Sequence, residues 1–105
     1  MNTVIRDWFI VSIFDAENLV GNVLWGYVIY DSTCRYLKDD FICTSNIVRI
    51  NSTNQLITTR SGSLYQTIEK GRRSKVYFDE FELLRNGFSP PQVEAIRMSP
   101  TLKIH

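Results

Sequence analysis

Runs of apolar residues, some continuous and some alternating with polar residues, divide the first two thirds of the chain into extended segments. Residues 8–14 are rich in β-branched and aromatic side chains, which predicts a buried strand, with a helix as the alternative. Residues 21–30 alternate between two apolar faces and predict a long, curved strand, in which Gly26 marks a bend, a bulge or a close backbone contact. Residues 41–50 resume the extended pattern after a polar loop.

A hairpin is predicted between residues 56 and 68, with Ser61 and Gly62 as a two-residue turn. In this register three pairs lie opposite each other: Arg60 with Ser63, Thr58 with Tyr65, and Leu56 with Thr67. One face of the hairpin is then polar and aromatic and carries Arg60, Ser63 and Tyr65. We interpret this face as a candidate binding surface.

A basic segment at residues 70–75 ends the series of strands and is interpreted as a solvated loop. Its two arginines, Arg72 and Arg73, adjoin the hairpin face and complete the candidate binding set. The position of Lys70 at the far end of the second hairpin strand, roughly 20 Å from Arg60 at about 3.3 Å per residue, argues against one continuous basic patch.

The last third of the chain has a helical pattern with two capping signals. Asp79 is the predicted N-cap of a first helix that Gly87 ends. Ser89 caps a second helix, with Pro90 in its first position and Gln92 completing a capping box.

These elements predict an α+β fold, in which a curved antiparallel β-sheet carries two short C-terminal helices. The spacing of the strands suits antiparallel pairing, and residues 1–105 form a single domain of a size that supports one core. The sheet is either open or closed into a small, partly open barrel, and the sequence does not distinguish these two alternatives. Trp8 is assigned to the core, and Trp25 is left as either a core or a binding residue.

Composition removes several functional classes. The net charge of +1 is too small to attract nucleic acid or a membrane by bulk electrostatics. Cys34, Cys43 and the terminal His105 cannot complete a four-ligand zinc site, so we expect no metal and no cofactor. The apolar run 8–14 is too short for a secretory leader or a membrane span, and we therefore expect a cytoplasmic protein with reduced, packed thiols.

Catalytic motifs are missing from the sequence, and we expect a protein that is not an enzyme. The chain has no glycine-rich phosphate loop, nucleophile elbow or paired-histidine helix. Two acidic groups, Asp39 with Asp40 and Asp79 with Glu80 and Glu82, suit a solvated loop and a helix start better than acid–base catalysis.

Several short blocks resemble a family of small bacterial domains of unknown function. The blocks comprise Leu24–Gly26, Phe41–Ser45, Thr59–Tyr65 and Leu83–Pro90, so the resemblance covers most of the chain after residue 20. Proteins of this kind are similar to accessory products of phages, integrons and other mobile elements. The resemblance implies a role in inhibiting, tuning or protecting another macromolecule, and it carries over no catalytic residue.

We therefore expect a non-enzymatic protein-interaction module whose binding residues are Arg60, Ser63, Tyr65, Arg72 and Arg73, because interface hot spots favour aromatic and arginine side chains. The alternative is a small β-rich nucleic-acid-binding protein that uses the basic loop at residues 70–75. No membrane partner is expected, and self-association as a homodimer stays open.

Overall fold

The computed structural model describes residues 2–99 and contains seven strands followed by three helical segments in that range. The strands are β1 (Thr3–Asp15), β2 (Asn18–Asp31), β3 (Phe41–Cys43), β4 (Ile47–Asn51), β5 (Leu56–Thr59), β6 (Leu64–Thr67) and β7 (Arg72–Tyr77). The helical segments are a 3₁₀ turn (Phe78–Glu80), α1 (Phe81–Arg85) and α2 (Pro90–Met98). The predicted α+β class with two short C-terminal helices is confirmed.

The strands form one mixed sheet in the order β3-β2-β1-β6-β5-β4, with β7 pairing β1 beside this path. Four of the pairings are antiparallel, but β6 and β7 both run parallel to β1. The prediction of an antiparallel sheet is therefore wrong in these two pairings. The sheet is open rather than a closed barrel, because β4 at its end pairs only with β5 among the described strands.

Strand β1 uses one edge for two different partners. Its start, Thr3–Ile5, pairs with β6, and its later part, Phe9–Phe14, pairs with β7. Only the first two residues of the basic segment, 70 and 71, are loop, because β7 begins at Arg72 and includes the other four. The run of charged side chains predicts a solvent-exposed loop. A strand can also expose charged side chains to solvent while its backbone forms hydrogen bonds with a neighbouring strand, as β7 does with β1.

A bulge in β1 separates these two pairings. Asp7 and Trp8 lie opposite the single residue Gly26 of β2, and Asp7 has a positive φ of 49°. A side chain at Gly26 would meet the Arg6 carbonyl oxygen and Trp8 Cβ at 3.2 Å, so glycine permits the close approach of the two strands. The predicted close contact at Gly26 is confirmed.

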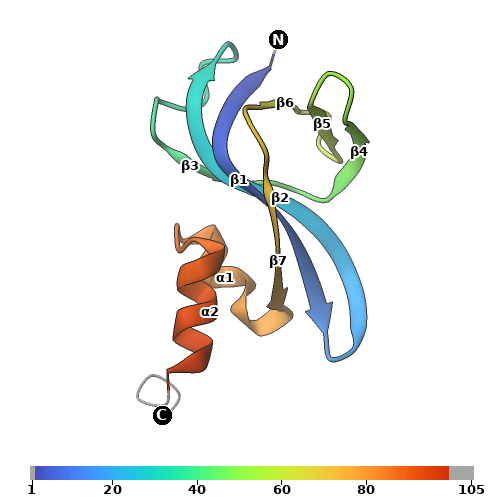
Figure 1. Ribbon diagram of the computed structural model, residues 1–105, viewed down its shortest axis with the longest axis vertical. Helices are drawn as coiled ribbons and strands as arrows, with labels where there is room; N and C mark the ends of the chain where they lie inside the picture. The colour runs from blue at the N-terminus through green and yellow to red at the C-terminus, as the bar shows by residue number, and fades with distance from the viewer. Residues whose placement is uncertain (1, 100–105) are drawn as a thin grey trace.

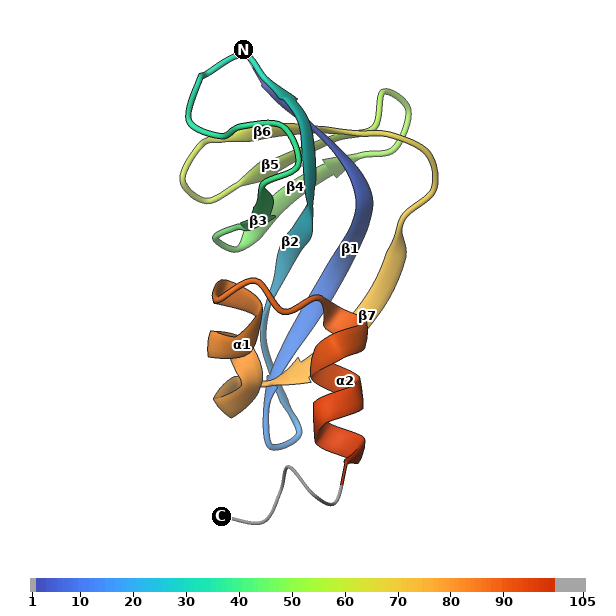
Figure 2. The same ribbon diagram turned by 90° about the vertical axis from the view of Figure 1, so that its left-hand side faces the viewer.

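The bulge also exchanges the two faces of β1, because one extra residue reverses the alternation of side chains. Ile5, before the bulge, faces the β4–β6 side, whereas Phe9 and Val11, after it, face the helices. The molecule consequently has two buried clusters, one on each face of the β1–β2 ribbon. Figures 1 and 2 show the helices on one side of this ribbon and β4–β6 on the other. The helix-side cluster contains Phe9, Val11, Ile13, Val23, Trp25, Val76, Leu84 and Val93. The hairpin-side cluster contains Ile5, Leu24, Val28, Ile42, Ile57 and Tyr65.

The helices dock on the lower half of the ribbon in Figure 1 through the helix-side cluster. Trp25 is fully buried there, and its indole N–H donates to the Leu84 carbonyl oxygen at 3.3 Å. Arg97 of α2 forms an ion pair with Glu80 at 2.7 Å and also donates to the Lys75 carbonyl oxygen of β7 at 3.0 Å. Helices this short are marginal alone, and these contacts provide the tertiary support they need.

One of the two predicted helix caps is correct. The Ser89 hydroxyl accepts from the Gln92 N–H at 3.3 Å, and the Gln92 side chain accepts from the Ser89 N–H at 2.8 Å, which confirms the capping box. The Asp79 cap is wrong, because the helical region begins with a 3₁₀ turn at Phe78, directly after β7, and Tyr77 occupies the cap position. The Glu80 side chain accepts from the Tyr77 N–H at 2.9 Å and so stabilises this earlier start.

The predicted register of the β5–β6 hairpin is wrong by one residue. Leu56 pairs with Gln66 and Ile57 with Tyr65, so the connection contains three residues, 60–62, instead of two. The Thr59 N–H donates to the Ser63 carbonyl oxygen at 3.1 Å and closes this loop. The observed register places the Tyr65 ring in the hairpin-side cluster, where burial favours it over the solvent face.

A buried carboxylate holds the start of β1, the end of β2 and the following loop together. Asp31 accepts hydrogen bonds from the hydroxyls of Thr3 and Thr33 and from the backbone N–H groups of Thr33, Arg35 and Tyr36, at 2.6 to 3.0 Å. Burial alone would raise the pKa of Asp31, but the hydrogen bonds outweigh it and lower this pKa well below its ordinary value. The ionised form is therefore the one that stabilises the fold.

Replacing this carboxylate tests that conclusion. Asp31→Asn should lower the free energy of unfolding by about 1–3 kcal/mol at neutral pH, because an amide cannot accept all of these bonds. A group with a depressed folded pKa stabilises above its unfolded value of about 3.9, so the difference from the wild type should shrink as the pH falls below about 4. Urea unfolding across this pH range measures both effects. Asp15→Asn, at the exposed end of β1, is the control, and an equal effect of the two substitutions would contradict the assignment.

Candidate functional site

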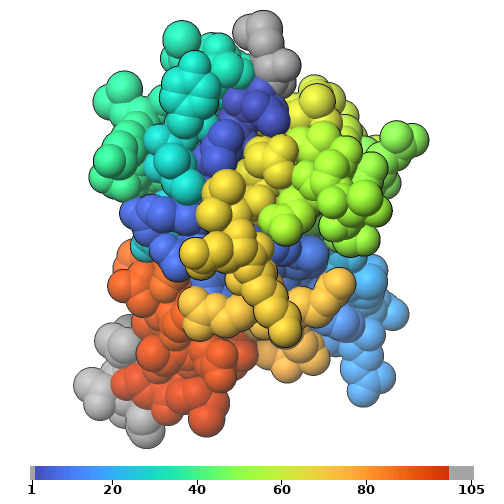
Figure 3. All heavy atoms as spheres, turned by 45° about the horizontal axis from the view of Figure 1, so that its top comes forward, coloured from blue at the N-terminus to red at the C-terminus, as the bar shows by residue number. Residues whose placement is uncertain are grey.

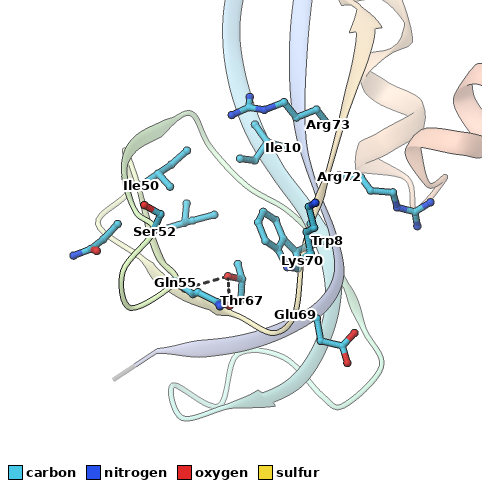
Figure 4. Close-up of a pocket in the computed structure, with 13 residues that line it drawn as sticks. Trp8, Ile10, Ile50, Ser52, Gln55, Thr67, Glu69, Lys70, Arg72 and Arg73 are labelled. Carbon is cyan, nitrogen blue, oxygen red and sulfur yellow. Dashed lines mark hydrogen bonds between the residues drawn. The ribbon is translucent and has the colours of Figure 1, made fainter.

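A cleft of about 560 Å³ lies between the β4–β5 turn and the segment that leads from β6 into β7 (Figure 3). We call it the Trp8 cleft. Its floor is apolar: Figure 4 shows Trp8 and Ile10 there and Ile50 across from them, and Ile57 also lines the cleft. The remaining lining residues are Asn51, Ser52, Gln55, Thr67, Glu69, Lys70, Gly71, Arg72 and Arg73.

The Trp8 ring is held in place on two sides. Its indole N–H donates to the Ile68 carbonyl oxygen at 3.1 Å. A Cβ atom at Gly71 would come within 2.5 Å of the ring, so the absent side chain of Gly71 makes room for it. Because the polar edge of the indole is already paired within the protein, the ring offers the cleft an apolar surface.

Positive charge is concentrated on the β7 side of the cleft. Lys70 and Arg73 are exposed there, and Figure 4 shows Arg73 extending above Ile10. Arg72 points away from the cleft, with its guanidinium group 4.6 Å from the centre of the Phe9 ring. Glu69, the one acidic lining residue, also points outward. The cleft therefore combines an apolar floor with a cationic rim.

A second hollow of about 370 Å³ continues from the Trp8 cleft along β4. We call it the β4 groove, and it is lined by Ile10, Asn22, Ile47, Val48, Arg49, Ile50 and Arg73. The two hollows share Ile10, Ile50 and Arg73, so they lie next to each other as adjoining parts of a depression between β4 and β7. Arg49 adds a further exposed cation beside Lys70 and Arg73.

A further hollow of about 790 Å³ lies where the β1–β2 turn meets the helices. Its charged lining includes Arg97 and Glu80, which form an ion pair with each other. Arg97 also donates to the Lys75 carbonyl oxygen. These groups connect α2 to β7, and we assign this hollow a structural role.

The five residues predicted to bind a partner do not form one surface. Arg60 is exposed in the β5–β6 loop, and Ser63 accepts a hydrogen bond from Arg35 at 3.3 Å. The Trp8 cleft lies at the opposite end of β5 and β6, where Gln55 and Thr67 meet. Arg72 and Arg73 lie on β7, and only Arg73 extends over the cleft in Figure 4.

Tyr65 is only 3% exposed and cannot act as the surface aromatic residue that the predicted hairpin face required. Burial, with a contribution from nearby Tyr36, raises the pKa of its hydroxyl. The two tryptophans also differ from expectation. Trp8, assigned to the core, is half-buried and lines the cleft, whereas the undecided Trp25 is in the core.

Trp8, Ile10 and Ile50 are not predicted as site residues from the sequence, because each lies in an apolar run that is typical of a core strand. Two signals pointed to the cleft. The charged pair Arg6 and Asp7 interrupts the apolar pattern at the beginning of the first strand, and such an interruption is typical of a β-bulge. Gly71 stands alone between basic residues, where a strand would favour a side chain.

The thiols are both free, and they differ in their surroundings. Cys43 is partly buried on β3, and burial raises the pKa of its thiol to about 11, although the nearby positive charge of Arg85 lowers it slightly. A protonated thiol of this kind is a packing group rather than a nucleophile. Cys34 is exposed, contrary to the expectation that both thiols are packed.

Among residues 2–99, no cluster of three or more histidine, cysteine or acidic side chains has the geometry to hold a metal ion. In the same range no helix has the length and apolar character to span a membrane. His105, the one histidine of the sequence, lies outside the described residues.

Comparison with protein-family models, curated proteins and solved structures finds no match to this chain. The resemblance to small bacterial domains therefore stays a prediction. The Trp8 cleft, through its geometry and chemistry, is the feature of this chain that points to a function.

Filling the space at Gly71 tests how the cleft is built. Gly71→Ala should displace the Trp8 ring and lower the free energy of unfolding by about 1–3 kcal/mol, the usual cost of overpacking. The Trp8 indole N–H resonance should shift because its hydrogen bond to Ile68 is disturbed. Gly62→Ala, at a position with a positive φ and open space, should cost about 1 kcal/mol and leave this resonance unchanged. An unshifted resonance in Gly71→Ala would contradict the proposed packing.

Proposed function

We propose that the protein is a cytoplasmic, non-enzymatic protein-interaction module, and that its Trp8 cleft binds an apolar side chain of a partner segment flanked by acidic residues. The observation that carries this proposal is the fixed indole face of Trp8, which lies with Ile10 and Ile57 below a rim of cations. Concave, mostly apolar and preformed sites are the usual shape of binding pockets.

The apolar floor supports an anchor residue. Burying a leucine or phenylalanine side chain contributes about 1.5–3 kcal/mol, and contact with an aromatic ring adds to this. Because Trp8 is already held by Ile68 and Gly71, little side-chain freedom is lost on binding. A cleft with these properties suits a short segment of a partner protein.

The rim supports an acidic partner. Lys70 and Arg73 are exposed beside the cleft, and the single acidic lining residue points away from it. Exposed charges such as these accelerate association with a segment of opposite sign and are screened by salt. Their contribution to affinity is smaller than that of the buried anchor.

Single-stranded nucleic acid is the second candidate, because Trp8 lies beside Lys70 and Arg73 and a base can stack on an indole. The lining favours a peptide. Sequence-tolerant single-strand binding uses several aromatic side chains in series, whereas Trp8 is the one aromatic residue among the lining residues of the cleft. The other contacts are aliphatic, as an apolar side chain prefers.

The role as an accessory or regulatory protein of a mobile element belongs to the same proposal. Such a protein acts by binding another macromolecule, and a single cleft on a small domain is sufficient for that purpose. The free thiols Cys34 and Cys43 are compatible with a reducing cytoplasm.

Selection from a random displayed peptide library tests the proposal. We expect enrichment of peptides with an apolar or aromatic residue next to Asp or Glu. Ile50→Asp and Arg73→Glu should each weaken binding of the selected peptides by about tenfold or more, as hot-spot changes do. Leu19→Asp and Arg60→Glu are the matched controls at exposed positions outside the cleft, and they should have little effect. Calorimetry measures the affinities.

The same variants separate the two candidate functions. Selection of no peptide, or binding that the control variants weaken as much as the cleft variants, would overturn the proposal. If the chain instead binds single-stranded oligonucleotides with a steep salt dependence that Arg73→Glu reduces, nucleic-acid binding would replace it.

A further inference from the structure

The Trp8 cleft opens onto an unpaired strand edge. β4 ends the sheet order and pairs only with β5 among the described strands. Residues 48–51 are all exposed, including Val48 at 57% and Ile50 at 48%. An edge strand presents a row of N–H and C=O groups that a further strand can pair with.

The depression beside β4 has room for such a strand. The β4 groove is lined by all four residues of Ile47–Ile50 and adjoins the Trp8 cleft at Ile50. A segment laid along β4 would therefore bring alternate side chains onto the apolar floor, since successive side chains of a strand point to opposite faces. One end of that segment would reach Trp8.

The facing strand β7 is protected differently. Arg97 of α2 donates to the Lys75 carbonyl oxygen of β7, which occupies a backbone acceptor on that strand. Covering an edge is one way in which proteins prevent unwanted pairing. Along β4 the corresponding feature is the charge of Arg49, which selects between partners rather than excluding all of them.

Arg49 disfavours a second copy of this chain as the added strand. It is the middle residue of β4, so symmetric antiparallel pairing of two β4 strands centred on it would place the two Arg49 side chains directly opposite each other. Like charges in that position destabilise the pair. With Arg73 lining the same groove, the charge pattern complements an acidic segment.

We propose that an acidic, extended segment of a partner protein binds as an added antiparallel or parallel strand on β4, with an apolar side chain in the Trp8 cleft and acidic side chains next to Arg49 and Arg73. This inference rests on the proposed function and specifies its binding mode. A peptide backbone matches the strand edge with both donors and acceptors, whereas a sugar–phosphate backbone supplies chiefly acceptors.

Backbone methylation of the ligand tests the pairing directly. Peptides selected by the full chain from the random library are synthesised with N-methyl groups on alternate residues, in two complementary sets. Only alternate residues of an added strand bond to β4, so one set should weaken binding by about tenfold or more and the other should be tolerated. Equal effects of the two sets would overturn strand addition.

Amide hydrogen exchange locates the pairing on the protein. With the unmodified peptide bound, amides of residues 47–51 should gain protection, whereas amides of residues 60–63, in the β5–β6 loop, should not. Peptide binding without protection of β4 would overturn strand addition and leave the proposed function intact. Absence of any peptide binding would instead overturn the proposed function.

A proline variant gives a second test. Val48 is the extra residue of the β4 bulge and has no partner on β5, and bulges on edge strands are positions that tolerate proline. Val48→Pro removes a backbone N–H from the edge of β4 and should weaken peptide binding by about tenfold or more. Val48→Ala keeps this N–H and should have a small effect.

The exchange pattern of β5 and β6 in the proline variant verifies that the sheet is intact. Unchanged binding by a folded Val48→Pro variant, or a stable dimer formed through β4 in solution, would contradict the proposal. Preferential binding of single-stranded oligonucleotide at this groove would contradict it as well.

Discussion

The contact of Trp8 with the segment Ile68–Gly71 is the interaction on which the rest of the structure depends. The bulge at Asp7 and Trp8 ends the pairing of β1 with β6 and precedes its pairing with β7. At that point Trp8 donates to Ile68 and packs over Gly71, which guides the chain from one partner strand to the next. A single edge of β1 therefore supports both halves of the sheet, at the cost of one interrupted ladder.

The same bulge produces the two faces that make the site. Because it reverses the alternation of side chains, Phe9 and Val11 pack under the helices while Trp8 and Ile10 face the β4–β6 side. β4 lies across this face without closing onto β7, so an apolar floor stays accessible between two strands. The cleft and the unpaired edge are thus consequences of one irregularity in β1.

The residues assigned to binding from the sequence pattern differ in where the fold places them. Arg73 is predicted from its charge to be exposed and to bind, since a cation in a short basic run is exposed in most folds. It lies on the rim of the cleft. Tyr65 was assigned to the same surface and is buried, since a single additional loop residue moved it to the other face of the hairpin. Trp8 and Ile50 were assigned to apolar runs, and their accessibility depends on strands distant in sequence.

The sequence by itself determined the local features of this protein: the long strand at Gly26, the Ser89 capping box and the helix that ends before Gly87, which together indicate the α+β class. These features depend on side chains within a few residues of one another, so their periodicity and capping residues can be recognised directly in the sequence. Only the tertiary structure decided the parallel pairing of β6 and β7, the burial of Tyr65 and the existence of the Trp8 cleft. The physical reason is that each of these requires contacts across about 60 residues, such as Trp8 with Ile68, whose formation depends on every strand between them.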